Sequence, residues 1–406
     1  MDFNYSPEDE AFRQEVREWL KENLPKIREL MCAQGVSTRS ALIRAEGSAP
    51  RMRPQQEGSW QREWLRMLGE KGYALPHWPK EYGGGGLSLM QQVILDEEMT
   101  RAGAPPTGNA IAFGFAGPTI LTHGTEEQKK RFIPKMITGE EIWCQGFSEP
   151  DAGSDLASLK CRAVIDGDDY VINGQKVWSS GAHHADWQIL LVRTDPTAPK
   201  HKGITYLLVD MHTPGIEVRP LKQITGNAEF NEVFYDNVRV PRSAVCGQEN
   251  RGWYVAMTTL GFERASGGQG ITMKRTIDEL VRLATKTMRN GRPAIEDPAI
   301  RSRLAQGAIE GQITVLNGFR ILSARLKRQA PGPEAQMGKV FRSELNVRMT
   351  ELATEILGPE SILDKGDETI RRWQYSFLRA KGNTIEMGTS EILRNVIGER
   401  ILGLPR

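Results

Sequence analysis

The chain has 406 residues, of which 39% are hydrophobic and 26% are charged, a composition that is ordinary for a globular protein in water. Its 53 basic and 51 acidic residues leave a formal net charge of +2, which gives no reason to expect a nucleic acid or a membrane as partner. No apolar run approaches the roughly 18 residues of a spanning helix, and the acidic start resembles neither a signal nor a transit peptide. We therefore expect a cytoplasmic protein of two or three packed domains.

The first third of the chain, from residue 6 to about 138, has helical patterns. Ser6 precedes a proline and three acidic residues, which is the usual composition of a helix start. Residues 33–58 are polar and interrupted by glycine and proline, so we expect a surface loop there. Further helices are expected over residues 60–71, 89–102 and 125–138.

The middle of the chain, residues 142–246, changes to short alternating or β-branched runs that are typical of strands. Asp166-Gly167 and Asn173-Gly174 are turn signals between these runs. We expect an antiparallel β-domain with strands over residues 161–164, 169–172, 187–193, 203–210, 216–220 and 229–240.

The last part of the chain returns to a helical pattern, with segments near residues 251–289, 297–329, 334–357 and 367–380. The predicted fold class is therefore α+β. We expect a helical N-terminal domain over residues 1–140, a middle antiparallel β-domain over 141–247 and a C-terminal helical bundle over 248–406.

Several kinds of site are not indicated. No Gly-x-Gly-x-x-Gly follows a predicted strand, and the chain contains no Walker A or His-Glu-x-x-His motif. The four cysteines are scattered without a Cys-x-x-Cys pair, which favours reduced thiols. His183 and His184 are adjacent, so they do not share one face as metal ligands do, and we interpret them as ordinary loop residues. We expect no metal centre.

Two short runs in the middle domain point to chemistry. Residues 146–155 (GFSEPDAGSD) combine small residues and hydroxyls on a flexible backbone, which can turn N–H and O–H groups toward an oxygen-rich ligand. Residues 173–181 (NGQKVWSSG) place Trp178 beside two hydroxyls, an arrangement suited to stacking on a flat ring and hydrogen-bonding its edge. Each run alone is equally compatible with a glycine-rich hairpin around a core tryptophan.

Together the two runs resemble the middle-domain motifs of the acyl-CoA dehydrogenase family. The resemblance extends over nearly the whole chain, through the segments 77–84, 292–295, 336–339, 355–358 and 387–394 in that order. It implies an FAD enzyme that acts on an acyl-CoA substrate. It also implies a tetramer with shared sites, either a homotetramer or a mixed tetramer.

The resemblance assigns roles to individual residues. It places the segment Gln145–Ser154, Phe147 included, along the FAD, with Ser148 near the reactive edge of the flavin and Ser154 facing the coenzyme A part of the substrate. The isoalloxazine contacts it implies are Trp178, Ser179 and Ser180, the last at a position where the family more often has threonine. The remaining FAD contacts that it implies are Arg292 at the pyrophosphate of a neighbouring subunit, Ile295 where the family often has phenylalanine, and Glu355, Gly358, Thr389 and Glu391 around the adenosine and phosphate parts.

The base needs a carboxylate within reach of the substrate α-carbon. Many family members have it in the tail immediately before Gly-Thr, but here Met387 occupies that position, and a thioether cannot accept the proton. Glu386 is one residue away, and in an extended segment such a shift points the side chain the other way. The resemblance implies that the backbone N–H of Met387 still helps to polarise the thioester oxygen.

A second arrangement in the family, as in the isovaleryl and long-chain types, takes the base from the first long helix of the C-terminal domain. The matching residue is Glu263, which shares a helical face with apolar and small residues. Gly267, Gly268 and Gly270 each cost roughly 1 kcal/mol in a helix, so a close approach to a ligand is expected there. The neighbours Phe262 and Arg264 are expected to line the substrate. The alternative for Glu263 is an ion pair at a subunit interface.

We expect from the resemblance an acyl-CoA dehydrogenase that passes electrons from FAD to an electron-transfer flavoprotein. One alternative is an oxygen-using flavoenzyme of the same fold, an acyl-CoA oxidase or a monooxygenase. The other is a non-catalytic partner subunit of a mixed tetramer.

Overall fold

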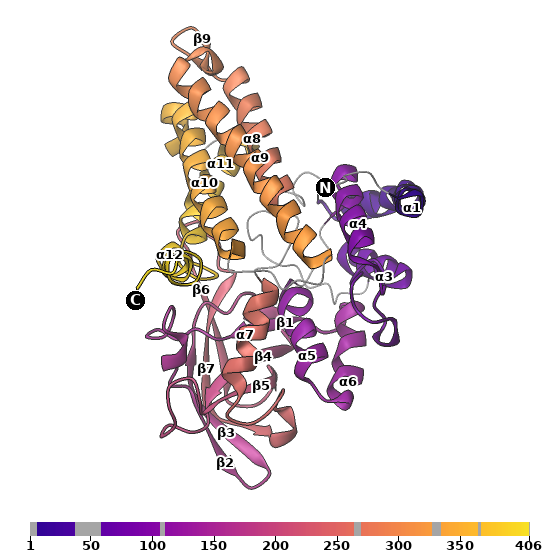
Figure 1. Cartoon of the computed structure of the whole chain (residues 1–406), viewed down its shortest axis with the longest axis vertical. Helices are drawn as coiled ribbons and strands as arrows, with labels where there is room; N and C mark the ends of the chain where they lie inside the picture. The colour runs from indigo at the N-terminus through magenta and orange to yellow at the C-terminus, as the bar shows by residue number, and fades with distance from the viewer. Residues whose placement is uncertain are drawn as a thin grey trace. The chain divides into compact units, whose positions relative to one another are not determined.

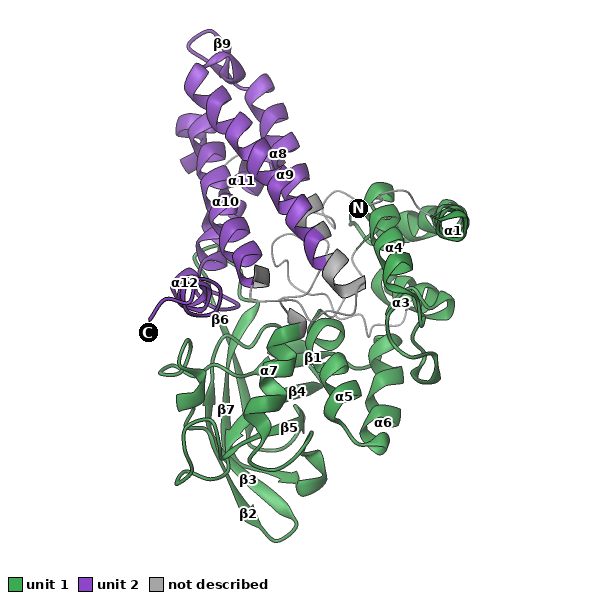
Figure 2. Ribbon diagram, in the orientation of Figure 1, with its two compact units in different colours: residues 1–263 green, residues 264–406 purple. Residues whose placement is uncertain are grey.

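The computed structural model describes residues 6–36, 58–105, 110–263, 269–326, 334–363 and 367–405 (Figure 1). The chain divides into two compact units, residues 1–263 and residues 264–406 (Figure 2). Within the described ranges, no helix is both long enough and apolar enough to cross a membrane.

The first unit begins with a helical layer. Its helices are α1 (Pro7–Ala33), α3 (Trp60–Lys71), α4 (Leu89–Ala102), α5 (Gly117–His123) and α6 (Glu126–Ile137). Ser6 caps α1 as predicted, because its hydroxyl accepts a hydrogen bond from the backbone N–H of Asp9 at 3.1 Å. The core of this layer contains Trp64 and Trp78, each 1% exposed. Most of the loop expected over residues 33–58 lies outside the described residues.

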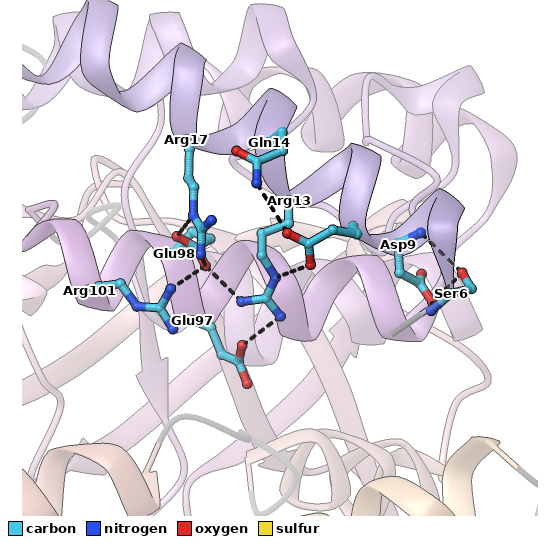
Figure 3. Close-up of polar contacts among 9 residues, drawn as sticks. Ser6, Asp9, Arg13, Gln14, Arg17, Glu97, Glu98 and Arg101 are labelled. Atoms are coloured by element: carbon cyan, nitrogen blue, oxygen red, sulfur yellow. Dashed lines mark hydrogen bonds and ion pairs between the residues drawn. The ribbon is translucent and has the colours of Figure 1, made fainter. Parts of the chain in front are cut away.

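A buried charge cluster joins α1 to α4 (Figure 3). Glu98, only 3% exposed, accepts hydrogen bonds from Arg13 at 2.8 Å and from Arg17 at 2.8 Å. Arg101 adds a third contact to the same carboxylate at 3.0 Å, and Arg13 also reaches Glu97 at 3.2 Å. Burial alone raises the pKa of the Glu98 carboxyl, but the hydrogen bonds from Arg17 and Arg13 outweigh burial and hold that pKa below its usual value.

Substituting Glu98→Gln is expected to destabilise the protein by about 2 kcal/mol, because Arg13 loses its charged acceptor in a buried site. A carboxyl whose pKa is lowered on folding contributes stability above its unfolded pKa and loses that contribution as pH falls through the folded pKa. The wild type should therefore lose stability relative to Glu98→Gln below roughly pH 4.5. Urea unfolding at pH 7 and pH 4 measures both effects. Glu22→Gln, at an exposed pair with Lys26, is the control and should change stability by under about 0.5 kcal/mol at either pH.

The first unit continues into a seven-stranded sheet with the order β1-β4-β2-β3-β7-β6 and β5 paired with β4. The strands are β1 (Trp143–Gly146), β2 (Arg162–Asp166), β3 (Asp169–Lys176), β4 (Trp187–Arg193), β5 (Ile204–Asp210), β6 (Ile216–Leu221) and β7 (Phe230–Pro241). The prediction of a purely antiparallel domain was wrong, because β1 and β2 both run parallel to β4. The segment from Phe147 to Cys161 is long enough to return the chain to the same end of the sheet.

One predicted turn lies inside a strand. Asp166-Gly167 does connect β2 to β3, but Asn173-Gly174 belongs to β3, where the pairing with β7 shifts register. Gly174 has φ of +151°, and a Cβ there would lie 2.7 Å from the Cα of Cys161. The glycine therefore permits a bulge and a close backbone approach rather than a hairpin turn.

Helix α7 (Gly252–Glu263) closes the first unit and packs on β5. Its buried Thr259 is 2.8 Å from the hydroxyl of Thr119 on α5 and 3.3 Å from that of Tyr206 on β5. These contacts fix the rotation of α7 about its axis. Ala256 and Val255 are buried on the same side, whereas Tyr254 and Met257 are exposed.

The second unit is a helical bundle. It contains α8 (Gln269–Lys286), the short hairpin β8 (Met288–Arg289) and β9 (Arg292–Pro293), α9 (Pro298–Leu326), α10 (Glu334–Leu357), α11 (Glu368–Asn383) and α12 (Ser390–Arg400). Helix α10 contacts α8, α9, α11 and α12, so it is the central element (Figure 1). The predicted helical segment near residues 251–289 contains α7 and α8, and the residues 264–268 between them lie outside the described ranges.

Candidate active site

The two motif runs of the middle domain meet in the first unit. The backbone N–H of Val177 donates a 2.9 Å hydrogen bond to the carbonyl of Ser148. This contact brings Ser148, the expected flavin-edge residue of the first run, to the middle of the second run, next to Trp178. Both runs were identified from the sequence, and in the structure they lie side by side.

A buried ion pair supports this junction. Lys176 is fully buried, and its Nζ donates to the carbonyl of Phe147 at 3.0 Å and to the Glu149 carboxylate at 2.8 Å. The same carboxylate accepts the backbone N–H groups of Lys160 at 2.7 Å and Cys161 at 2.9 Å. Both charged groups lie within the motif runs, but sequence reasoning did not single them out. Lys176 is the one charged residue of the second run, which was an available signal, whereas Glu149 is one of three acidic residues in the first run and nothing in the sequence distinguishes it.

Trp178 stands out on the surface of the sheet. It adopts φ of +61°, a left-handed conformation that is unusual for a bulky residue, and its side chain is 58% exposed. Its ring meets that of Phe230 edge to face at 5.8 Å. An exposed indole held in a strained backbone is a typical feature of a binding site. The flat face that it offers fits an isoalloxazine.

The segment after Trp178 is fixed by β7. The backbone N–H of Ser179 donates to the carbonyl of Asn231 at 3.0 Å, and Gly181 donates to that of Glu229 at 2.7 Å. The amide of the buried Asn231 returns a 2.8 Å hydrogen bond to the carbonyl of Ser179. The hydroxyl of Ser179 is buried and has no hydrogen-bond partner among the described residues. Asn231 is a supporting residue that sequence reasoning missed.

The other predicted site residues of the middle domain lie in different environments. Phe147 is 5% exposed and its ring packs edge to face on Tyr206 at 5.9 Å, so its side chain belongs to the core. Gln145 lies on β1 and is partly buried, and Ser154 is exposed on the loop that follows. His183 lies in a short 3-10 helix, Ala182–His184, between β3 and β4, and its Nδ1 is 2.9 Å from the amide oxygen of Asn231.

In the second unit, the expected FAD contacts at the adenosine end lie on several elements. Arg292 is exposed on β9, and Ile295 packs against the core of the bundle. Glu355 on α10 forms an ion pair with Arg303 of α9. Gly358 has φ of +61° at the end of α10, a conformation that favours glycine and ends the helix there.

A turn between α11 and α12, residues 384–389, contains Met387 and is called the tail turn below. It is not extended, as the sequence argument assumed: Met387 has φ of +59° and Gly388 has φ of +92°. The Nζ of Lys339 donates to the carbonyl of Gly388 at 2.7 Å. Thr389 caps α12 by accepting the backbone N–H of Ile392 at 3.1 Å. Glu391 is exposed in the first turn of that helix, where helix N-termini favour anions.

Glu386 is held within the tail turn. Arg379 donates to its carboxylate at 2.7 Å, and the amide of Asn383 donates to the other oxygen at 2.7 Å. Both oxygens are therefore occupied by protein donors. This geometry does not favour Glu386 as the proton acceptor.

The backbone of Glu263 is described, and its side chain is not. It is the last residue of α7, three residues after Leu260 and seven after Ala256, which both pack toward the core of the first unit. The side chain of Phe262 and all of Arg264, Gly267 and Gly268 lie outside the described residues. Among the described residues, no group of three or more His, Cys, Asp or Glu side chains is placed to hold a metal ion.

Family models match this chain in three consecutive segments. They are the N-terminal domain of acyl-CoA dehydrogenase over residues 38–140, the middle domain over 144–238 and the C-terminal domain over 250–402. The chain belongs to the acyl-CoA dehydrogenase family. It is an oxidoreductase of the flavoprotein type, with the α+β fold of that family, as the motif runs predicted.

Relatives of this acyl-CoA dehydrogenase include the acyl-CoA dehydrogenase IpdE1 of Mycobacterium tuberculosis, 38% identical over 98% of each chain. FadE34 of the same organism is 43% identical over 84% of this chain and 46% of its own length. Among solved structures, one titled Tcur3481-Tcur3483 steroid ACAD aligns over 100% of both chains with a TM-score of 0.80 and 32% identity. The ChsE4-ChsE5 complex of M. tuberculosis aligns over 100% of both chains with a TM-score of 0.79.

Proposed function

We propose that this acyl-CoA dehydrogenase desaturates an acyl-CoA thioester to the 2-enoyl-CoA, with FAD as its cofactor and Glu263 as the base. The observation that supports the FAD most directly is Trp178, an exposed indole in a left-handed backbone, fixed beside Ser148 through the hydrogen bond of Val177. The partly buried Ser180 adds a hydroxyl two residues further along the chain. When bound, FAD supplies the oxidant that accepts a hydride from the β-carbon.

The chain's own residues supply the rest of the reaction. Glu263 takes the α-proton of the thioester, and it is the preferred carboxylate because Met387 has none and Glu386 is occupied by Arg379 and Asn383. The tail turn presents the backbone N–H of Met387 to the thioester oxygen, where negative charge develops. Lys339 keeps that turn in place by binding the carbonyl of Gly388.

Two similar structures support a choice of substrate class and assembly. The titles of two similar structures name a steroid acyl-CoA dehydrogenase and a complex of two components. We therefore include polycyclic thioesters among the substrates and a mixed tetramer among the assemblies, with the homotetramer as the other form. An electron-transfer flavoprotein would be the protein partner that accepts the electrons.

Purified protein is expected to contain about one FAD per chain and to lose its flavin absorbance anaerobically when the right acyl-CoA is added. The panel should contain straight, branched, dicarboxylic and polycyclic thioesters. An artificial electron acceptor should restore the absorbance. Rapid reoxidation by oxygen with formation of hydrogen peroxide points instead to an oxidase, and protein without FAD points to a non-catalytic partner subunit.

A further inference from the structure

A face of α10 is directed toward the tail turn. Lys339, which is 6% exposed, binds the carbonyl of Gly388 at 2.7 Å. Two turns later, Asn346 donates to the side-chain oxygen of Asn383 at 2.8 Å. Arg342 lies three residues after Lys339 and four before Asn346, so it belongs to the same face.

The charge on this face is not balanced. Lys339, Arg342 and Arg379 are three cations, and Glu386 is the carboxylate of the tail turn. Arg379 takes one oxygen of Glu386 at 2.7 Å, and Asn383 takes the other. Within the described part of the chain, Arg342 makes no hydrogen bond or ion pair with another residue, although it is partly buried. A guanidinium offers five donors, and leaving them unused away from water is costly.

The electrostatics agree with this geometry. Burial lowers the pKa of the Arg342 guanidinium to about 10, and the nearby Glu386 carboxylate opposes the shift only in part. Burial also lowers the pKa of Lys339, although Glu386, Glu344 and Glu391 act in the other direction. Glu344 is itself paired with Arg394 at 2.6 Å. The face therefore holds more positive charge than its carboxylates neutralise.

We propose that Arg342, with Lys339 beside it, binds an oxyanion of a ligand at the tail turn. The shared chemistry is a planar fork of donors that recognises a carboxylate or a phosphate. The sources are a carboxylate on the acyl chain, a phosphate of coenzyme A or a phosphate of FAD. The first source rests on the proposed function, because it requires the thioester to lie against the tail turn.

Arg342→Met is the test, with Arg342→Lys as the conservative variant and Arg348→Met as the matched control. Arg348 is on the same helix, but it is already paired with Glu310 and is 47% exposed. Dissociation constants are measured by equilibrium titration with FAD, with free coenzyme A, with octanoyl-CoA and with its ω-carboxyl analogue. Arg342→Met should weaken at least one of them by about tenfold or more. Arg342→Lys should weaken it less, and Arg348→Met should leave all four unchanged.

The pattern identifies the source. If only the ω-carboxyl thioester binds more weakly, the bound oxyanion is the carboxylate of the acyl chain. If both thioesters and free coenzyme A bind more weakly, it is a phosphate of coenzyme A. If FAD binds more weakly, it is a phosphate of the cofactor. Unchanged binding of all four ligands overturns the proposal. So does a large fall in the melting temperature of Arg342→Met, because removal of an unpaired charge should leave it unchanged or raise it. The dissociation constants are measured without turnover, so they test the anion site independently of the reaction. If Arg342 binds one of these ligands but acyl-CoA never reduces the flavin, the proposed reaction is contradicted and the anion site is not.

Discussion

Glu263→Gln should abolish flavin reduction by acyl-CoA while leaving FAD and thioester binding intact. Glutamine has nearly the shape of glutamate but cannot accept the α-proton at neutral pH. Removing a positioned general base typically costs roughly 10²–10⁴-fold in rate. The measurement is stopped-flow loss of flavin absorbance after anaerobic mixing with the thioester that works best for the wild type. The thioester dissociation constant should change by less than about threefold, because the reaction loses a transition-state contact and not a binding contact.

Glu386→Gln is the comparison, because it removes the nearest alternative carboxylate without changing its shape. Glutamine keeps one carbonyl oxygen that can accept from Arg379, but its amide nitrogen cannot accept from Asn383. The tail turn should therefore lose one hydrogen bond, and the rate should fall by less than about tenfold. If Glu386→Gln is inactive and Glu263→Gln turns over normally, the assignment of the base is wrong. If both variants retain the wild-type rate, the proton leaves to a group that neither residue provides.

Lys176→Met should destabilise the protein by about 3–5 kcal/mol, which makes it the largest stability effect expected in the first unit. The ammonium of Lys176 is buried, and it donates hydrogen bonds to the carbonyl of Phe147 and to the carboxylate of Glu149 in place of water. Without the ammonium, that carboxylate remains buried with only the N–H groups of Lys160 and Cys161. The residues concerned belong to the two motif runs, so FAD should also be released more readily. Chemical denaturation and the FAD content after gel filtration measure the two effects.

A second substitution separates the charge from the packing. Lys176→Met combined with Glu149→Gln removes the stranded carboxylate and should recover a large part of the lost stability. Lys200→Met, at an exposed pair with Asp155, should change stability by no more than about 1 kcal/mol. Equal destabilisation by Lys176→Met and Lys200→Met contradicts a special role for the buried pair. So does a double variant that is no more stable than Lys176→Met alone.

The sequence and the structure each determine a different part of the assignment of the base. The sequence excludes the tail position, because Met387 has no titratable group, and that conclusion needs no coordinates. The structure adds that Glu386 is occupied by Arg379 and Asn383. It also shows a turn where an extended segment was assumed, because Gly388 and Met387 adopt positive φ. A sequence does not specify the φ of a methionine, since that conformation is held by neighbours distant in the chain.

The sequence by itself determined the family, the succession of a helical, a β and a second helical region, and the two motif runs, one of which contains Trp178. Helix caps and strand periodicity are local, so Ser6 and the runs of the middle domain could be recognised from neighbouring residues alone. Only the tertiary structure decided the parallel pairing of β1 and β2 with β4, the burial of Lys176 with Glu149, and the place of Arg342 near Glu386 without an ion pair among the described residues. Each of these depends on which residues far apart in the chain become neighbours. The pattern along the chain records what each residue prefers, and long-range packing decides which partner it meets.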